Sequence, residues 1–344
     1  MNSTVDPSPS APFARPRWGG GKGPIAELRH RLRSWGPLIA LVVLCFGFGV
    51  ADPGFATLQN VQTVVDRGAI RLILAVGMTF IIIQGSMDLS IEGLMAASSL
   101  TFAMLVFNSR TDLDLGLLGI LAGMGVGGLF GLLSGIIVTK LRIPSFMVTL
   151  GIWSVSMGIA MLVSGGQPPL IRDAAIRTLG LGQTFGFPNL GIVALGCLAL
   201  GCVLQTYTRF GRYSYVIGGG EDLARLSGIK VDRYKIMVFA FSGLLAGLAG
   251  VLESARIGLG HVDIGLGQMF AAITAVVIGG TSLSGGRGGV LQSAVGVIIL
   301  VVLANGMIFV GVSPYFQKAV QGAIILAAIL GATWHLRDRL RIVK

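Results

Sequence analysis

The chain has 344 residues, of which 53% are hydrophobic and only 12% are charged, and its formal net charge is +11. Because soluble proteins carry about 25% charged residues, this composition excludes a water-soluble globular protein and predicts an integral membrane protein. The positive charge does not indicate nucleic-acid binding, since the basic residues are scattered over separate short segments.

Ten apolar runs along the chain can each form a transmembrane helix, which needs about 20 apolar residues to cross ~30 Å of hydrocarbon. The runs lack the strict alternation of barrel strands, so helices are expected to satisfy the backbone in lipid. We therefore predict an all-α bundle of about ten transmembrane helices. In chain order the runs are Ser34–Ala51, Leu72–Met87, Gly93–Ser109, Leu115–Thr139, Ile143–Ile171, Pro188–Thr208, Ile236–Leu252, Ile264–Gly286, Gly288–Gln317 and Ala319–Leu336.

The polar segments define the expected domain organisation and orientation. Residues 1–33 are expected to form a disordered basic tail, residues 34–336 one transmembrane domain, and residues 337–344 a second tail. Most lysines and arginines lie in the tails and in residues 206–235. Since positively charged loops remain in the cytoplasm, both termini and the loop 206–235 are predicted to be cytoplasmic.

Motifs for covalent or nucleotide chemistry are absent from the sequence. The pair Gly21-Lys22 is followed by Gly23, whereas a phosphate-binding loop needs serine or threonine there. The three histidines are far apart in the sequence, and the three cysteines lie in apolar runs without metal-site spacing. We therefore expect no enzymatic activity, no metal and no cofactor.

One segment of the loop 206–235 has the features of a short surface helix. Three glycines from Gly218 are expected to interrupt the preceding helix, and acidic residues then favour a new helix N-terminus. Leucine and alanine give this helix a partly apolar face, and Gly228 is expected to end it. Taken alone, the segment is also compatible with an ordinary amphipathic linker. Its members are Gly218, Gly219, Gly220, Glu221, Asp222, Leu223, Ala224, Arg225, Leu226, Ser227, Gly228 and Ile229.

Five segments in order along the chain match the motifs of one transporter family. They are Val76–Thr79, Met87–Ser90, Ile143–Gly151, Gly218–Ile229 and Gly279–Gly288. These segments resemble the patterns G-M-T…G-I-D-L-S, I-P-P-F-I-V-T-L-G, G-G-N-E-x-A-A-R-x-S-G-I and G-G-T-S-L-S-G-G-R-G. The patterns belong to the permease subunits of ribose-type (monosaccharide) bacterial ABC importers.

The resemblance covers nearly the whole chain, from about Gly36 to Thr333. It implies the ABC importer permease fold, with Gly218–Ile229 as the coupling helix that docks on a cytoplasmic ABC ATPase. Two departures from the family pattern, at Gly220 and Leu223, fall inside this helix. The other implied partners are a periplasmic sugar-binding protein, membrane lipid and a second permease copy, in a homodimer or a heterodimer.

The resemblance further implies import of a pentose or hexose across the bacterial inner membrane, with ATP hydrolysis in a separate subunit. Two alternatives remain. The cargo of the same architecture could be an amino acid, a nucleoside or a signalling furanose. An ion-coupled secondary carrier would instead need titratable residues clustered at mid-membrane.

Candidate residues for the translocation path or gate lie at polar positions within the apolar runs. Asp88 is one of the two acidic residues most embedded in apolar sequence, and intramembrane charges usually face a protein interior or a cavity. The alternative is that Asp88 caps the following helix. The uncharged candidates are Gln84, Ser86, Ser154 and Thr281.

A possible internal repeat includes three of these candidate positions. Gly85–Ser90 and Gly280–Ser284 are similar with one gap. Transporters are often built from repeated halves, so we take this similarity as a hint that the two segments play equivalent parts.

Overall fold

The computed structural model describes residues 24–333. The predicted tail over residues 337–344 and most of the tail over residues 1–33 lie outside the described residues, whereas residues 24–33 belong to a helix. The chain divides into two units, Met1–Gly36 and Pro37–Lys344. The bundle described below belongs to the second unit.

The described residues confirm the all-α class, and each predicted run overlaps a long or medium helix, although the run Gly288–Gln317 also includes the start of α13. Helices α6 and α8 and a two-stranded hairpin were not predicted as separate elements. Helix α9 corresponds to the short helix that was predicted in the loop 206–235. The α-helices are α1 (Pro24–Ala51), α2 (Leu58–Ile83), α3 (Ile91–Leu105), α4 (Leu117–Lys140), α5 (Ser145–Ser164), α6 (Ala174–Leu181), α7 (Asn189–Tyr207), α8 (Arg209–Gly219), α9 (Glu221–Leu226), α10 (Val231–Ile257), α11 (Gln268–Ile278), α12 (Val290–Phe309) and α13 (Pro314–Thr333). The remaining elements are the 3-10 helices η1 (Pro53–Ala56) and η2 (Val262–Gly265) and the antiparallel strands β1 (Gln183–Thr184) and β2 (Phe187–Pro188).

Five of these helices, α4, α5, α7, α10 and α12, are long and apolar enough to cross a membrane. By contrast, α3 has 15 residues and α11 has 11. At 1.5 Å per residue they extend for about 22 Å and about 16 Å, less than the ~30 Å of hydrocarbon. The membrane-protein class is therefore supported, while the number of ten spans stays a prediction.

Helix α10 is longer than the predicted run Ile236–Leu252, because its end is set by capping. Gly258 follows the helix with φ 83°, the left-handed conformation that ends many helices. The guanidinium of Arg177 on α6 donates hydrogen bonds to the last carbonyl groups, at 3.0 Å for Ala255 and 2.9 Å for Arg256. The helix therefore continues past the first charged residue after the apolar run and carries two charges into the bundle.

Helix α2 likewise begins well before the predicted run Leu72–Met87. Thr57 is its N-cap residue, and the Thr57 Oγ1 accepts a hydrogen bond from the backbone N–H of Asn60 at 3.3 Å. Residues 58–71 of α2 include Asp66, Arg67 and Arg71, which the prediction placed outside the span. Capping residues, and not the first charged residue beyond the apolar run, determine where α2 begins and where α10 ends.

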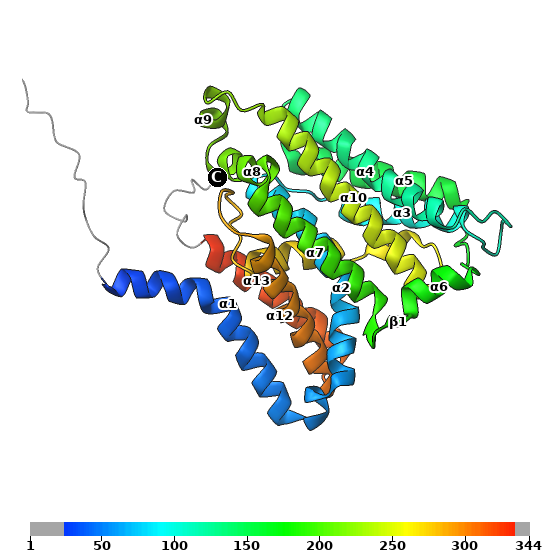
Figure 1. Cartoon of the computed structure of the whole chain (residues 1–344), viewed down its shortest axis with the longest axis horizontal. Coiled ribbons are helices and arrows are strands. Elements are labelled where there is room, and N and C mark those ends of the chain that lie inside the picture. The colour runs from blue at the N-terminus through cyan, green and yellow to red at the C-terminus, as the bar shows by residue number, and fades with distance from the viewer. Residues whose placement is uncertain (1–23, 334–344) are drawn as a thin grey trace, which may run out of the picture. The chain divides into compact units, whose positions relative to one another are not determined.

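Helix α10 packs against α2, α3 and α4, and its closest approach is to α4 (Figure 1). Glycines on both helices allow this approach. A Cβ atom on Gly127 of α4 would lie 2.7 Å from the Cα atom of Gly247 on α10. Small residues at such positions let membrane helices meet backbone to backbone.

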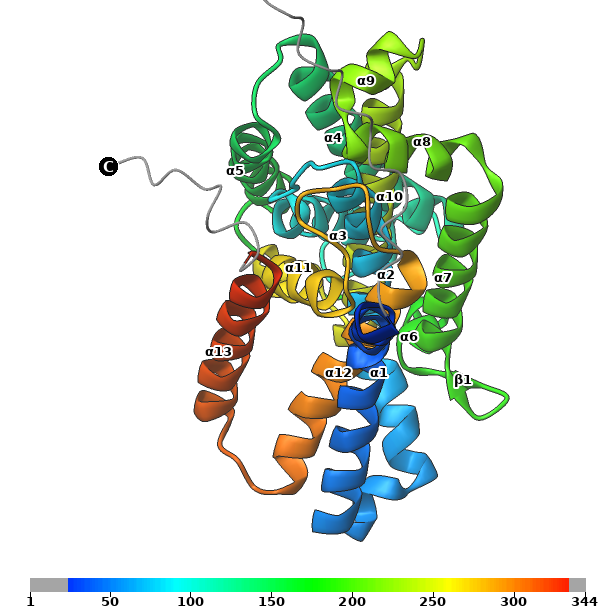
Figure 2. The same ribbon diagram turned by 90° about the vertical axis from the view of Figure 1, so that its left-hand side faces the viewer.

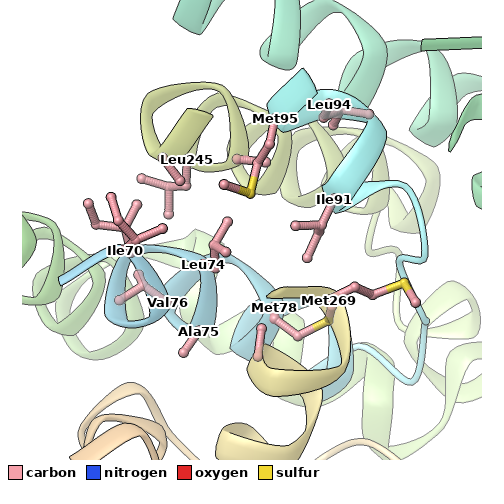
Figure 3. Close-up of a cluster of buried hydrophobic side chains, with 14 of the residues drawn as sticks. Ile70, Leu74, Ala75, Val76, Met78, Ile91, Leu94, Met95, Leu245 and Met269 are labelled. Carbon is pink, nitrogen blue, oxygen red and sulfur yellow. The ribbon is translucent and has the colours of Figure 1, made fainter. Parts of the chain in front are cut away.

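A cluster of buried apolar side chains fills the space between α2, α3, α10 and α11. Figure 3 shows Leu74 of α2 pointing toward Ile91 and Met95 of α3, with Met78 and Met269 beside them. All five side chains are buried. We call these five residues the apolar centre.

The bundle has two distinct ends. Figure 1 shows α8 and α9 at one end and α6 with β1 at the other. Figure 2 shows the short helix α11 between α13 and α3, and it contacts both. The end that carries α8 and α9 contains most of the residues that the sequence singled out.

The contact of α4 with α10 predicts which glycine substitutions destabilise the bundle. Gly127→Val should lower the free energy of unfolding by about 1–3 kcal/mol, because the new side chain overlaps α10. Gly125→Val on the same helix is the matched control, since nothing lies within 4 Å of its Cβ position. Thermal unfolding of the detergent-solubilised protein measures both, and equal stability of the two variants would contradict this packing.

Candidate functional site

The segment of residues 84–90, between α2 and α3, is not helical although it lies inside the bundle. Side chains of α5 satisfy its backbone. The N–H of Met87 donates to the Ser145 Oγ at 2.9 Å, and the N–H of Leu89 donates to the Thr149 Oγ1 at 3.0 Å. Because unpaired backbone groups are costly in a membrane, these hydroxyls allow the helix to be interrupted here.

Asp88 is at the centre of this segment and is only 1% exposed. Its Oδ1 accepts a hydrogen bond from the N–H of Ser90 at 2.9 Å, and its Oδ2 lies 3.5 Å from the Ser242 Oγ on α10. Ser90, not Asp88, is the N-cap residue of α3, and it makes no side-chain cap bond. The capping hypothesis for Asp88 is therefore wrong. Among the side chains that the structure describes, the partners of its carboxylate are hydroxyl groups and a backbone amide, and none is basic.

Thr281 lies in the second candidate segment, the loop 279–289 between α11 and α12. It is buried, and its Oγ1 accepts a hydrogen bond from the N–H of Gly289 at 3.3 Å. The same oxygen lies 3.4 Å from the Ser293 Oγ, which accepts from the Thr79 Oγ1 of α2 at 2.7 Å. A chain of hydroxyl groups thus connects the loop to α12 and α2.

The two candidate segments begin with the same backbone turn. Gly85 has φ 73° after α2, and Gly280 has φ 104° after α11. In each case the N–H of the glycine and the N–H of the next residue, Ser86 or Thr281, donate back into the last helical turn at 2.9 and 3.1 Å. These two hydrogen bonds form the Schellman motif. The similarity of the two sequences therefore corresponds to a shared local structure.

Helix α8 lies directly against both segments. The N–H of Gly286 donates to the carbonyl oxygen of Ile83 at 2.8 Å, which joins the two segments to each other. Gly218 of α8 packs on this bond, since a Cβ atom there would lie 2.6 Å from the Gly286 nitrogen and still closer to the Ile83 oxygen. The Tyr215 hydroxyl donates to the carbonyl oxygen of Gly288 at 2.6 Å. We call this contact of three segments the backbone junction.

Side chains fix α8 to the neighbouring helices. The Gln84 Nε2 at the end of α2 donates to the Ser214 Oγ at 3.1 Å, and both residues are buried. The ring of Phe210 lies 5.0 Å from that of Phe80 on α2 and 5.8 Å from that of Phe241 on α10. Such aromatic contacts add to the stabilisation by burial, so α8 is held firmly in the bundle.

The predicted surface helix is present as α9. Its start differs from the prediction, since Gly218 and Gly219 belong to α8 and only Gly220 separates the two helices. Its end agrees. Gly228 has φ 78°, its N–H donates to the Arg225 carbonyl oxygen at 3.0 Å, and the N–H of Ile229 donates to that of Ala224 at 3.1 Å.

The apolar residues of α9 do not share one face of the helix. Ala224 is completely buried in a small cluster with Ile217 and Val231. Leu223 and Leu226 are instead 69% and 84% exposed. The prediction that Ala224 shares a docking face with the leucines is therefore wrong, and the exposed apolar surface consists of the two leucines.

Ion pairs hold α9 to the start of α10. Glu221 contacts Arg225 at 2.9 Å and Lys235 at 2.5 Å, and Arg225 also contacts Asp232 at 2.6 Å. Burial alone would raise the pKa of Glu221, but the hydrogen bonds from Lys235 and Arg225 hold this pKa below its ordinary value. These partly exposed pairs orient α9 without adding much stability.

The structure brings together four of the five predicted path residues. Gln84, Ser86 and Asp88 share one segment, which touches the loop that carries Thr281. Ser154 is exposed on α5, where its hydroxyl donates to the Leu150 carbonyl oxygen at 3.4 Å, and it lies apart from the others. The part that these residues play in transport remains a prediction.

Sequence reasoning missed the side chains by which α8 packs against its neighbours. Phe210, Ser214 and Ile217 recur at helical spacing, and this period was the signal that could have revealed an amphipathic helix. It also missed Glu253 of α10, which lies one residue beyond the predicted apolar run and is buried.

Known proteins match the chain over most of its length. The family model of the branched-chain amino acid transport system / permease component matches residues 60–329. The ribose import permease protein of Escherichia coli (strain K12) is 36% identical over 297 residues, which cover 85% of this chain and 91% of that protein. The ribose import permease protein of Bacillus subtilis (strain 168) is 34% identical over 301 residues, covering 87% and 92%.

The L-arabinose transport system permease protein of Escherichia coli (strain K12) is 33% identical over 296 residues, which cover 86% of this chain and 89% of that protein. No solved structure matches the chain. The aligned length includes both candidate segments and the two helices α8 and α9.

Proposed function

The chain belongs to the family of branched-chain amino acid transport system permease components, and from this premise we propose that it is the membrane permease subunit of an ABC importer for a monosaccharide, a pentose or hexose. Relatives named for ribose and for L-arabinose transport support a sugar as cargo. ATP hydrolysis then belongs to a separate cytoplasmic subunit, because the chain itself has no phosphate-binding motif.

The observation that carries the proposed mechanism is the backbone junction. Helix α9 offers exposed Leu223 and Leu226 to the groove of the ATPase. When ATP closes the ATPase pair, α9 moves and α8 moves with it. Because Gly218 touches the loop 279–289 and Ile83, the residue directly before the segment 84–90, this movement reaches Thr281 and Asp88 and opens the path on one side of the membrane.

The orientation follows from the distribution of positive charge. A Cβ atom on Gly135 of α4 would lie 2.8 Å from the Cα atom of Ile236 of α10, so Lys140 at the end of α4 lies at the same end of the bundle as α9. Positive residues on short loops favour the cytoplasm. We therefore place the α8–α9 end in the cytoplasm of a bacterium and the α6 end on the outer side of the inner membrane.

The proposed partners fit the surfaces of the bundle. Exposed leucines such as Leu118, Leu162 and Leu195 on α4, α5 and α7 suit contact with lipid or with a second permease copy. The binding protein would deliver the sugar to the α6 end, opposite the ATPase. Neither α9 nor the candidate segments would take part in covalent chemistry.

Reconstitution into proteoliposomes tests the energy source. The chain alone should neither hydrolyse ATP nor take up sugar. Together with its ATPase and the loaded binding protein it should hydrolyse ATP and take up D-ribose or L-arabinose. Uptake by the chain alone under a proton or sodium gradient would show a secondary carrier and contradict the proposal.

Substitutions on α9 test the docking surface. Leu226→Glu should weaken binding of the ATPase at least tenfold, because burying an unpaired charge at an interface costs several kcal/mol. The permease itself should stay folded, since Leu226 is exposed. Ala224→Glu is unsuitable because Ala224 is buried within the chain.

The matched control is Leu113→Glu, which adds the same charge at another exposed apolar position, in the α3–α4 connection. Co-purification of the ATPase measures both variants. Full binding by Leu226→Glu would mean that α9 is only a linker.

A further inference from the structure

Five charged side chains lie together between α2 and α10. They are Asp66, Arg67 and Arg71 on α2 and Glu253 and Arg256 on α10, and we call them the charge cluster. Arg256 contacts Glu253 at 2.6 Å and Asp66 at 3.6 Å. The cluster lies near the α6 end of the bundle, since Arg256 is the last residue but one of α10. Charged residues within membrane helices are rare, and they usually mark a substrate path.

Part of the cluster is fully paired. Arg256 contacts both carboxylates, and the Arg67 Nη1 donates to the Asn305 Oδ1 of α12 at 3.3 Å. The Asn305 Nδ2 in turn donates to the Asn60 Oδ1 at 2.6 Å. These contacts join α2, α10 and α12 and hold the cluster in place.

Two groups of the cluster have hydrogen-bonding capacity that the described part of the chain does not use. Glu253 is 8% exposed, and its Oε2 is buried without a hydrogen-bond partner in the described part of the chain. Arg71 interacts electrostatically with Arg67, Glu253 and Arg256. Among the side chains that the structure describes, however, no hydrogen bond or ion pair of its guanidinium is formed. A buried polar atom without a partner costs free energy, so the Glu253 Oε2 needs a donor, and the half-buried Arg71 has N–H groups free to bind the same ligand.

These two groups restrict the chemistry of that ligand. The Arg71 guanidinium can only donate hydrogen bonds, and the Glu253 carboxylate can only accept them. A hydroxyl group both donates and accepts, so neighbouring hydroxyls satisfy both residues at once. An anion would pair with Arg71 but be repelled by Glu253, and a cation would meet the opposite difficulty. The pair therefore favours a solute without net charge, and among such solutes the sugar of the proposed function satisfies both groups through its hydroxyls.

We propose that the charge cluster is the site that receives the sugar on the outer side, where Arg71 donates to one hydroxyl and the Glu253 Oε2 accepts from another. This inference rests on the proposed function and adds two contacts to the proposed translocation path of the sugar. Asp66, Arg67 and Arg256 are positioning residues. Leu74 follows Arg71 by one helical turn, so the apolar centre lies next along α2 and separates this site from Asp88 and Thr281.

The test uses the complete complex of permease, ATPase and loaded binding protein in proteoliposomes, with D-ribose and L-arabinose as probes. Arg71→Gln and Glu253→Gln should each lower the sugar moved per ATP about tenfold or more, as expected for a lost hydrogen bond to a charged group. The stimulated ATPase rate should change by less than about twofold, because the α9 surface and its ATPase partner are untouched. Arg172→Gln and Asp112→Asn are matched controls, since both side chains are exposed.

Each other outcome overturns the inference. Unchanged transport by both variants would show that neither group meets the sugar. A parallel fall of transport and ATPase rate would show a purely structural role. Loss with Arg71→Gln together with a gain with Glu253→Gln would indicate an anionic solute.

A second variant keeps the test valid if Arg71→Gln fails to assemble. Arg71→Lys retains the positive charge but not the planar set of donors, so it should assemble and still move less sugar per ATP. Normal transport by this variant would overturn the inference. A wild-type complex that takes up no pentose or hexose would contradict the proposed function itself, and with it this site.

Discussion

The hydrogen bond from the N–H of Gly286 to the carbonyl oxygen of Ile83 joins the two interrupted segments of the bundle, and Gly218 of α8 packs on both of its atoms. No side chain fits at this contact. The main chain of α8 therefore meets the main chain of both segments without a flexible layer between them. A displacement of α8 cannot be absorbed by side-chain rotation, because packed interiors respond by discrete shifts.

The membrane imposes a second constraint on the same region. Interrupted helices leave backbone groups that lipid cannot satisfy, and here polar side chains satisfy them. Ser145 and Thr149 accept from the segment after α2, while the Gln205 Oε1 accepts from the first N–H of α12 at 2.6 Å. Side-chain hydroxyl and amide groups can exchange partners when a segment moves. The region thus combines a rigid contact with α8 and replaceable polar contacts along the proposed path.

Local signals in the sequence predicted most of the elements but not all of their ends or faces. Apolar runs identified the helices, and Gly228 marked the end of α9 because the left-handed turn needs a residue without Cβ strain. The ends of α2 and α10 were missed, since Thr57 and Arg177 cap them and the apolar pattern does not include caps. Ala224 is buried by contacts with Ile217 of α8 and Val231 of α10. One partner of Asp88, Ser242 of α10, lies 154 residues later in the sequence. Such tertiary contacts cannot be predicted from the local periodicity of apolar residues in the sequence.

The central claim is that movement at α9 reaches the two candidate segments through α8. Hydrogen exchange of the permease–ATPase complex, with and without trapping of ATP by vanadate, tests it most directly. The account predicts that trapping speeds exchange at the amide of Gly286, together with changes across residues 84–90 and 209–219. Changes confined to residues 221–229, in a complex that still transports sugar, would contradict it.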